Sequence, residues 1–207
     1  MASVDDFFDH TFTGASVMAI LRGYSPERTV ELANRAWELG INCVEVPIQS
    51  AAAVEALAAT VNEGLASGRI VGAGTVTTVD RVEQAAAAGA GFTVAPGLDL
   101  RVAQASLEAG LAHLPGVATA SEIQLAVNHG MNWVKAFPAA SLGFTWFQGM
   151  RGPFPGVRIV ATGGINGHNA PDYLAAGADV VAVGSALEDP AQFELLAKLM
   201  PAGSPKP

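Results

Sequence analysis

Residues 119–137 read TASEIQLAVNHGMNWVKAF, which is a helix signal followed directly by a strand signal. Thr119 and Glu122 have the spacing of a capping box, in which two side chains satisfy free N–H groups at the start of a helix. Gly130 suits the left-handed conformation in which many helices end. The apolar run that follows, residues 131–137, has the length and composition of a buried strand. This segment therefore predicts a helix that leads straight into a strand.

The same unit recurs along the chain, because short apolar or β-branched runs alternate with stretches of helical periodicity. Glycines end the helical runs before other strands in the same way, at positions 40, 89, 110 and 177. Strands alternating with helices indicate βα units and a parallel sheet, and eight units predict an α/β fold closed into a single (β/α)8 TIM barrel. The expected strands are residues 17–21, 41–48, 70–73, 91–95, 111–114, 131–137, 157–162 and 179–183.

The chain of 207 residues fits one domain, residues 1–207, with the barrel over about 16–200. Residues 4–12 are expected to form a short helix that covers the barrel floor, and residues 201–207 a disordered tail. No linker separates a second domain. The N-terminal residues are acidic and aromatic, unlike a secretory leader, and no run resembles a transmembrane helix.

The charge balance excludes several classes of partner. Eleven Lys and Arg residues stand against 19 Asp and Glu, for a formal net charge of −8 without any basic run, so neither nucleic acid nor an anionic membrane is expected. Cys43 is the only cysteine, so no intramolecular disulfide can form, and the default location is the cytoplasm. No metal site is expected, because the histidines lack metal-ligand spacing; they are His10, His113, His129 and His168.

Lysine is scarce, and Lys135 is the unusual one. The other two, Lys198 and Lys206, fall in the last expected helix and in the tail, where solvent reaches them. Side chains alternate along a strand, so if the two residues adjacent to Lys135 pack under the helices, Lys135 points into the barrel. Burial disfavours the charged form of an amine, and the neutral amine is the nucleophile that forms an imine with a ketone.

Glu45 is expected to face the same interior, because the β-branched residues at 44, 46 and 48 occupy the alternate positions of its strand. A nucleophilic amine and a carboxylate on different strands of an apolar barrel form a nucleophile with its acid/base partner. Two structural interpretations compete with this one. The pair could be a buried ion pair without catalytic role, or Lys135 could reach solvent at the strand end.

Active sites of TIM barrels lie at the carboxyl ends of the strands, where this chain places polar residues and glycines. Arg22 follows the first strand and could bind a carboxylate or simply be a solvated charge. Thr75 places a hydroxyl after the third strand. Gly163 and Gly164 follow the seventh strand and Ser185 the eighth, where such barrels often bind phosphate. Two ordinary tight turns are the alternative.

Six motifs together resemble the class I 2-keto-3-deoxy-6-phosphogluconate / 4-hydroxy-2-oxoglutarate aldolase family, over about residues 16–190. They are VEVPIQS at 44–50, GAGTV at 72–76, APG at 95–97, PGVAT at 115–119, VKAFPA at 134–139 and TGGI at 162–165. Each motif is weak alone, but their order and spacing are specific. The resemblance implies a TIM-barrel homotrimer that needs no cofactor or metal.

The resemblance also implies roles for individual residues. Lys135 matches the family's Schiff-base lysine, and Glu45 matches its general acid/base. The further matches are Thr75, Pro96 and Phe137 around the pyruvate moiety, and Gly163, Gly164 and Ser185 in the phosphate-binding loops. The implied reaction cleaves a 2-keto-3-deoxy-6-phospho sugar acid to pyruvate and glyceraldehyde 3-phosphate, with 4-hydroxy-2-oxoglutarate, cleaved to pyruvate and glyoxylate, as a further substrate.

One position departs from the gluconate type of this family, which carries a carboxylate-binding arginine after the second strand. This chain has Gln49 followed by Ser50, a pattern similar to the 6-phosphogalactonate branch, and Arg22 becomes the expected carboxylate partner. Thr162, by contrast, is similar to the gluconate branch. The sequence therefore leaves open which configuration at C4 the enzyme prefers.

Two other classes of protein match parts of the pattern. Another phosphate-binding TIM-barrel enzyme, such as a thiamine-phosphate-synthase-like transferase or a phosphosugar epimerase, would share the glycine loops. It would also need a diphosphate and Mg²⁺ site, or a metal-binding set of carboxylates and histidines, that the sequence does not show. A non-catalytic ligand-binding barrel would tolerate Lys135 but gives no reason for Glu45 to face it.

Overall fold

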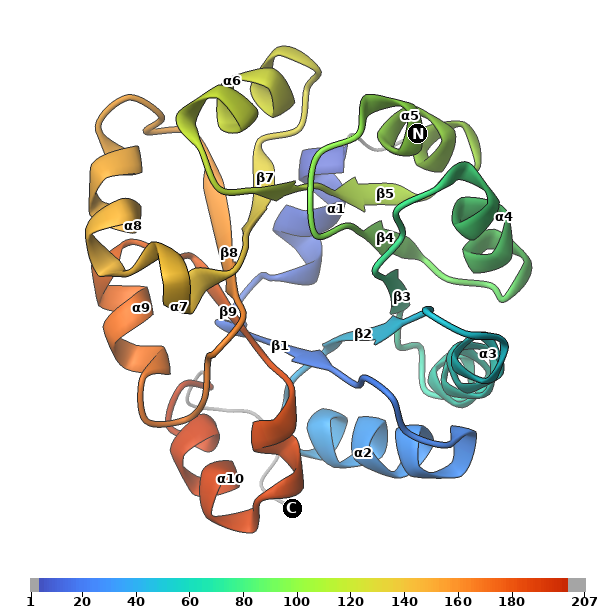
Figure 1. Ribbon diagram of the computed structural model, residues 1–207. Coiled ribbons are helices and arrows are strands. Elements are labelled where there is room, and N and C mark those ends of the chain that lie inside the picture. Colours follow the sequence, from blue (N-terminus) through green and yellow to red (C-terminus); the bar gives the residue numbers. More distant parts are fainter. Residues whose placement is uncertain (1–3, 201–207) are drawn as a thin grey trace.

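Within residues 4–200, the part of the chain that the computed structural model describes, nine strand segments form one parallel sheet curved into a barrel, with helices around it (Figure 1). The strands are β1 (Val17–Ile20), β2 (Cys43–Pro47), β3 (Val71–Gly74), β4 (Phe92–Val94), β5 (Ala112–Leu114), β6 (Gly116–Val117), β7 (Trp133–Ala136), β8 (Arg158–Thr162) and β9 (Val180–Val183). The predicted TIM-barrel architecture is confirmed. The expected tail, residues 201–207, lies outside the described residues.

The helices follow the strands in the predicted alternation. They are α1 (Val4–Thr11), α2 (Pro26–Glu38), α3 (Ala51–Ala66), α4 (Val79–Ala87), α5 (Leu100–Glu108), α6 (Ala120–Asn128), α7 (Ala139–Leu142), α8 (Phe144–Arg151), α9 (Ala170–Ala176), the 3-10 helix η1 (Ser185–Glu188) and α10 (Pro190–Ala197). In residues 4–200, no helix combines the length and the apolarity needed to cross a membrane.

The predicted helix boundaries are confirmed. The Thr119–Glu122 capping box is formed, and the glycines before the strands have positive φ, namely 91° at Gly40, 80° at Gly89, 78° at Gly110, 76° at Gly130 and 114° at Gly177. Glycine carries no Cβ penalty in this conformation, so each of these residues ends a helix at low cost.

The fifth barrel strand differs from the prediction, because Pro115 divides it into β5 and β6. Gly116 and Val117, expected to follow the end of the strand, instead form β6. β5 pairs with β4 and β6 pairs with β7, so the sheet order runs β5-β4-β3-β2-β1-β9-β8-β7-β6. Proline has no N–H to donate, but the carbonyl of Pro115 accepts a hydrogen bond of 2.8 Å from the Lys135 N–H. The barrel therefore opens only between two halves of one strand.

Alternation along the strands separates two apolar layers. Val44 on β2 and Val134 on β7 pack outward in the layer between strands and helices, whereas Cys43 and Trp133 pack inward. Successive side chains of a strand point to opposite faces, so Glu45 and Lys135 point into the barrel, as predicted.

Helix α1 closes the floor of the barrel and lies behind its centre in Figure 1. Phe8 is fully buried, with its ring 5.9 Å from that of Phe92 and 6.3 Å from that of Trp133. The Asp9 carboxylate accepts a hydrogen bond of 2.9 Å from the Trp133 indole N–H. The predicted floor helix is confirmed. These contacts leave the opposite, carboxyl end of the barrel for a site.

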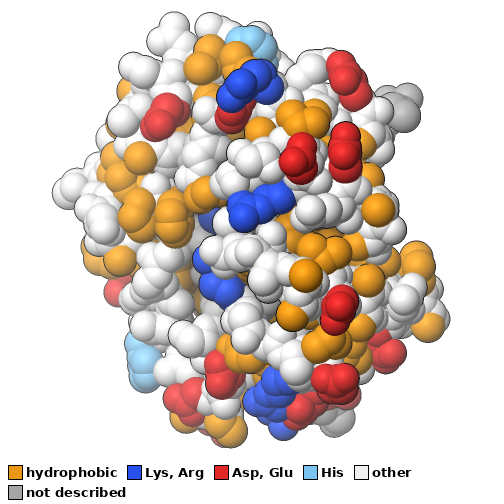
Figure 2. Space-filling model, turned by 45° about the vertical axis from the view of Figure 1, so that its right-hand side comes forward, with side chains coloured by type: hydrophobic (Ala, Val, Ile, Leu, Met, Phe, Trp, Pro, Cys, Tyr) orange, Lys and Arg blue, Asp and Glu red, His pale blue; other side chains and the backbone are white. Residues whose placement is uncertain are grey.

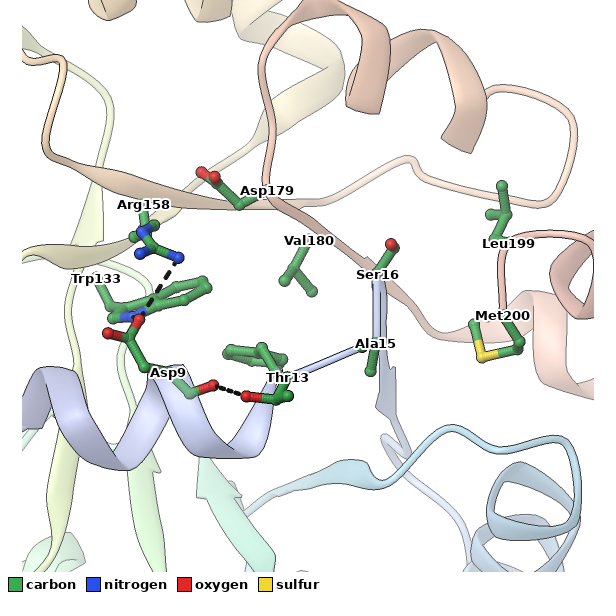
Figure 3. Close-up of a pocket in the computed structure, with 12 residues that line it drawn as sticks. Asp9, Thr13, Ala15, Ser16, Trp133, Arg158, Asp179, Val180, Leu199 and Met200 are labelled. Atoms are coloured by element: carbon green, nitrogen blue, oxygen red, sulfur yellow. Dashed lines mark hydrogen bonds and ion pairs between the residues drawn. The ribbon is translucent and has the colours of Figure 1, made fainter. Parts of the chain in front are cut away.

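A hollow also lies beside this floor, with a volume of about 630 Å³ (Figure 3). Its charged side chains have partners inside the hollow or beside it. Arg158 lies 3.5 Å from Asp9, and Asp179 accepts hydrogen bonds from the Arg151 guanidinium and the Ile159 N–H. These contacts hold the floor helix and the start of β8 together.

Candidate active site

Lys135 and Glu45 meet inside the barrel. They lie on β7 and β2, which are not neighbours in the sheet, so the two side chains meet across the barrel interior. The Lys135 Nζ is 3.8 Å from the Glu45 Oε2, and the side chains are 4% and 0% exposed. The structure therefore brings together the two predicted catalytic residues.

The geometry of this pair does not resemble an optimised structural ion pair. The separation of 3.8 Å is too long for a hydrogen bond, and neither carboxylate oxygen of Glu45 has a hydrogen-bond partner among the described residues. A buried carboxylate without donors costs free energy of folding. Both oxygens of Glu45 are therefore available to accept a proton or a hydrogen bond from a ligand.

The sequence around Glu45 is fitted to hold the carboxylate in place. A Cβ built on Gly74 of β3 would stand 1.8 Å from the Glu45 Oε1, so a larger residue would push the carboxylate out of its position. Packing against Glu45 therefore explains why the second glycine of the GAGTV motif, Gly74, is a glycine.

Arg22, Gln49 and Thr75 form a polar group at the ends of β1, β2 and β3. The Arg22 guanidinium donates to the Gln49 Oε1 at 3.2 Å and to the Thr75 Oγ1 at 3.5 Å. Thr75 has a φ of 57°, the single positive value among the non-glycine residues described. One cation thus connects three strand-end loops, and its remaining N–H groups are suited to a carboxylate.

A cleft of about 540 Å³ opens beside Arg22 at the same end of the barrel. In Figure 2, basic side chains lie in the hollow at the centre of this face and most acidic side chains lie toward its edge. Six of the predicted site residues line the cleft, namely Arg22, Phe137, Thr162, Gly163, Gly164 and Ser185. The prediction missed six others, Ile20, Tyr24, Ile165, Asn166, Ala182 and Gly184.

Five predicted residues do not line this cleft: Lys135, Glu45, Gln49, Thr75 and Pro96. Four of them adjoin it. The Lys135 Nζ lies 5.6 Å from the centre of the Phe137 ring, and Glu45 lies beside Lys135. Arg22 connects Gln49 and Thr75 to the cleft. Pro96 lies apart, where the backbone of Gly116 approaches its carbonyl group.

Two features favour glycine at both positions after β8: the left-handed backbone conformation and the small space beside the backbone. Gly163 and Gly164 have φ values of 98° and 79°, and a Cβ on Gly164 would come within 2.6 Å of the Ala140 Cβ. Just before them, the Thr162 hydroxyl is buried without a partner among the described residues, and Thr162 lines the cleft. A buried, unpaired hydroxyl in a cleft wall is available to a polar group of a ligand.

Tyr24, in the loop after β1, contacts the 3-10 helix η1 that follows the last strand. Its hydroxyl donates to the Glu188 Oε1 on η1. Burial, together with this carboxylate, raises the pKa of Tyr24 to about 12, so the phenol stays a donor even in alkaline solution. The sequence prediction did not include Tyr24, although its position two residues after Arg22 places it in the same strand-end loop.

A group of three or more His, Cys, Asp or Glu side chains that could hold a metal ion does not occur in residues 4–200.

A parallel barrel that holds a buried lysine beside a carboxylate without hydrogen-bond donors, with an arginine and two glycine loops at the same end, is the arrangement expected of an imine-forming carbon–carbon lyase, a class I aldolase. The sequence comparisons identify the group more closely. The profile of the family described as KDPG and KHG aldolase matches residues 8–197, and the chain belongs to this family.

Individual relatives agree with this assignment. The chain is 42% identical to 2-dehydro-3-deoxy-phosphogluconate aldolase of Treponema pallidum over 150 residues, which cover 72% of this chain and 70% of that protein. It is 33% identical over 175 residues to the probable 2-dehydro-3-deoxy-6-phosphogalactonate aldolase of Rhizobium meliloti, covering 84% of this chain and 82% of that one.

A solved structure shows the same fold with a reaction intermediate bound. KDPG aldolase from Legionella pneumophila, with pyruvate captured as a covalent carbinolamine, superposes with a TM-score of 0.78 and 30% identity. The match covers 91% of this chain and 94% of that one.

Proposed function

We propose that this enzyme cleaves 2-keto-3-deoxy-6-phospho sugar acids of the gluconate or galactonate type to pyruvate and glyceraldehyde 3-phosphate. Lys135 forms the Schiff base and Glu45 moves the protons. The observation that carries the proposal is the Lys135 Nζ lying 3.8 Å from a buried carboxylate that has no other partner among the described residues. Relatives of both the gluconate and the galactonate type support the substrate class.

The reaction begins when the neutral Lys135 amine attacks the C2 ketone. The carbinolamine loses water, with Glu45 transferring the proton, and leaves a protonated imine. The bond between C3 and C4 then breaks as Glu45 takes the proton of the C4 hydroxyl. The electron pair of the broken bond flows into the imine, which gives an enamine and the free aldehyde. Protonation of C3 by Glu45 and hydrolysis by water release pyruvate and restore Lys135.

The other site residues hold the two ends of the substrate. Arg22 binds the carboxylate, with Gln49 and Thr75 fixing its guanidinium. Phe137, whose ring centre lies 5.6 Å from the Lys135 Nζ, lines the pyruvate moiety. The family resemblance gives Pro96 the same role, although this residue does not line the cleft. The backbone at Gly163 and Gly164, with Ser185, binds the phosphate, as glycine loops after the last strands often do. Thr162 offers its unpaired hydroxyl to the substrate from the cleft wall.

Pyruvate release from both phosphorylated epimers and from 4-hydroxy-2-oxoglutarate tests this proposal. The rim combines Gln49 of one branch with Thr162 of the other, so we expect both epimers to be cleaved with kcat/KM values within about tenfold, the cost of one misplaced hydrogen bond. The unphosphorylated acid should be a distinctly poorer substrate. Equal rates on the unphosphorylated acid would refute the phosphate site, and no pyruvate from any of the three would refute the aldolase proposal.

We further propose that the chain forms one domain, with the barrel over about 16–200, and works as a cytoplasmic homotrimer without a cofactor or metal. The homotrimer is what the family resemblance implies, because the large apolar side chains exposed among the described residues are scattered along the chain. They are Leu65 at 69%, Ile70 at 44%, Val79 at 43%, Leu125 at 40% and Phe144 at 42%.

A further inference from the structure

Thr75 has a backbone conformation that its own side chain disfavours. Its φ of 57° lies in the left-handed region, which is a true outlier for a β-branched residue. The residues on either side keep backbone hydrogen bonds to adjacent segments, although β3 itself ends at Gly74. The Gly74 carbonyl accepts from the Ile48 N–H at 2.9 Å, and the Val76 N–H donates to the Val94 carbonyl at 3.0 Å. The left-handed turn is therefore confined to Thr75, and something outside the sheet must stabilise it.

Arg81 makes the contact that can do so. Its Nη1 donates to the Thr75 carbonyl oxygen at 3.1 Å and to the Thr77 hydroxyl at 2.6 Å. A guanidinium donor forms a stronger hydrogen bond than a neutral one, and its planar group fixes the direction of the acceptor. The peptide that follows the strained residue is thereby held in one orientation.

The helix dipole does not explain why residue 81 is an arginine. Arg81 lies in the first turn of α4, where the positive end of the helix dipole disfavours a cation. Its side chain is partly buried and extends back over the loop that precedes the helix, instead of standing free in solvent. The role of Arg81 therefore concerns that loop more than its own helix.

The opposite side of Thr75 faces the carboxylate end of the site. Its hydroxyl accepts from the Arg22 Nη2 at 3.5 Å, while the Arg22 Nη1 is held by Gln49. The backbone conformation of Thr75 sets the direction of this hydroxyl, so Arg81 and Arg22 are connected through a single residue.

We propose that Arg81 is a positioning residue, which stabilises the left-handed conformation of Thr75 and so orients the Arg22 guanidinium toward the substrate carboxylate. This proposal rests on the proposed function, in which Arg22 binds the carboxylate. It concerns binding of the keto acid and leaves the chemistry at Lys135 unchanged.

Borohydride trapping at increasing pyruvate concentration separates binding from chemistry, because the half-saturating concentration reports the first and the limiting rate the second. We expect Arg81→Gln to raise the half-saturating pyruvate concentration about tenfold, equivalent to about 1.4 kcal/mol, with the limiting rate almost unchanged. Arg81→Lys should recover part of the loss, since one donor remains for the Thr75 carbonyl. Arg101→Gln, on an exposed side chain whose one ion-pair partner in residues 4–200 is Asp99, is the matched control and should behave as wild type.

A glycine at position 75 tests the mechanism itself. Glycine adopts positive φ without strain and also lacks the hydroxyl that Arg22 contacts, so the path from Arg81 to Arg22 through residue 75 is absent. In a Thr75→Gly background the further change Arg81→Gln should therefore have no additional effect. An unchanged half-saturation in Arg81→Gln, a fall in the limiting rate alone, or an undiminished effect of Arg81→Gln in the glycine background would each overturn the proposal. If wild type itself forms no pyruvate imine, the proposed function is wrong and this inference falls with it. If wild type is trapped normally and Arg81→Gln matches it, only the role of Arg81 is wrong.

Discussion

Burial of the Glu45 carboxylate lowers the stability of the fold. The side chain is fully buried, and both oxygens lack hydrogen-bond donors among the described residues. The Lys135 amine 3.8 Å away offsets part of this cost through charge attraction, but an ion pair of this kind adds little to stability. The chemistry of imine formation and C–C cleavage uses such a carboxylate at each proton transfer.

Replacing Glu45 by Gln keeps the volume of the side chain and removes its ability to accept the C4 proton. We expect kcat to fall by roughly 10²–10⁴-fold, the usual contribution of a general acid/base, while the protein stays folded. The measurement is steady-state pyruvate release, with thermal unfolding as the check on the fold. Glu55→Gln, on the exposed side of α3, is the control for loss of a charge. Normal turnover by Glu45→Gln would mean that Glu45 is structural.

At the scale of the elements, β5 is joined to β4 and α5 by a buried chain of hydroxyl groups that ends at His113. The Thr93 hydroxyl lies 2.8 Å from the His113 Nδ1 and donates to Ser106, which donates to the Val102 carbonyl. Because the Thr93 hydroxyl uses its proton to donate to Ser106, it accepts a hydrogen bond from His113, and the Nδ1 atom is the protonated ring nitrogen. The Nε2 atom is buried without a partner among the described residues, so a second proton there would find no acceptor. Burial accordingly lowers the pKa of His113 to about 4.

This histidine predicts a loss of stability in mild acid. The unfolded chain takes up a proton near pH 6.5, whereas the folded protein resists it until about pH 4, so the free energy of unfolding should fall as the pH drops between these values. The loss from His113 is on the order of 3 kcal/mol at pH 4. Chemical denaturation from pH 7 to 4 measures it. His113→Gln should lower stability at pH 7 but flatten the pH dependence, whereas His168→Gln, at an exposed position, should leave the slope unchanged. An equally steep slope in His113→Gln would show that other groups cause it.

Local signals predict elements well where one cause decides the structure. The glycine at each helix end and the alternation around Glu45 and Lys135 are of this kind, because sterics and the two-residue period of a strand act on the chain alone. The division of the fifth strand at Pro115 was missed, since a two-residue strand has no periodicity and exists only through its pairing with β7.

For the whole molecule, the sequence predicted the barrel and the pair at its centre but only half of the residues that line the cleft. Tyr24 and Asn166 line it because the loops after β1 and β8 meet in space, and Ile20 lines it from the end of β1, an arrangement that no local pattern encodes. The role of Arg81 likewise depends on where its side chain turns after the helix has formed. Motif spacing therefore predicted that Lys135 and Glu45 meet, while the walls of the cleft required the structure.

The formation of an imine at Lys135 tests the central proposal most directly. Incubation with pyruvate and borohydride should inactivate the enzyme and leave a reduced pyruvyl adduct on the peptide that contains Lys135, because the reduced imine is a stable secondary amine. Lys198→Ala should be labelled as wild type is, and Lys135→Ala should not be labelled at all. An adduct on Lys198, or no adduct in the wild-type enzyme, would contradict the proposed mechanism.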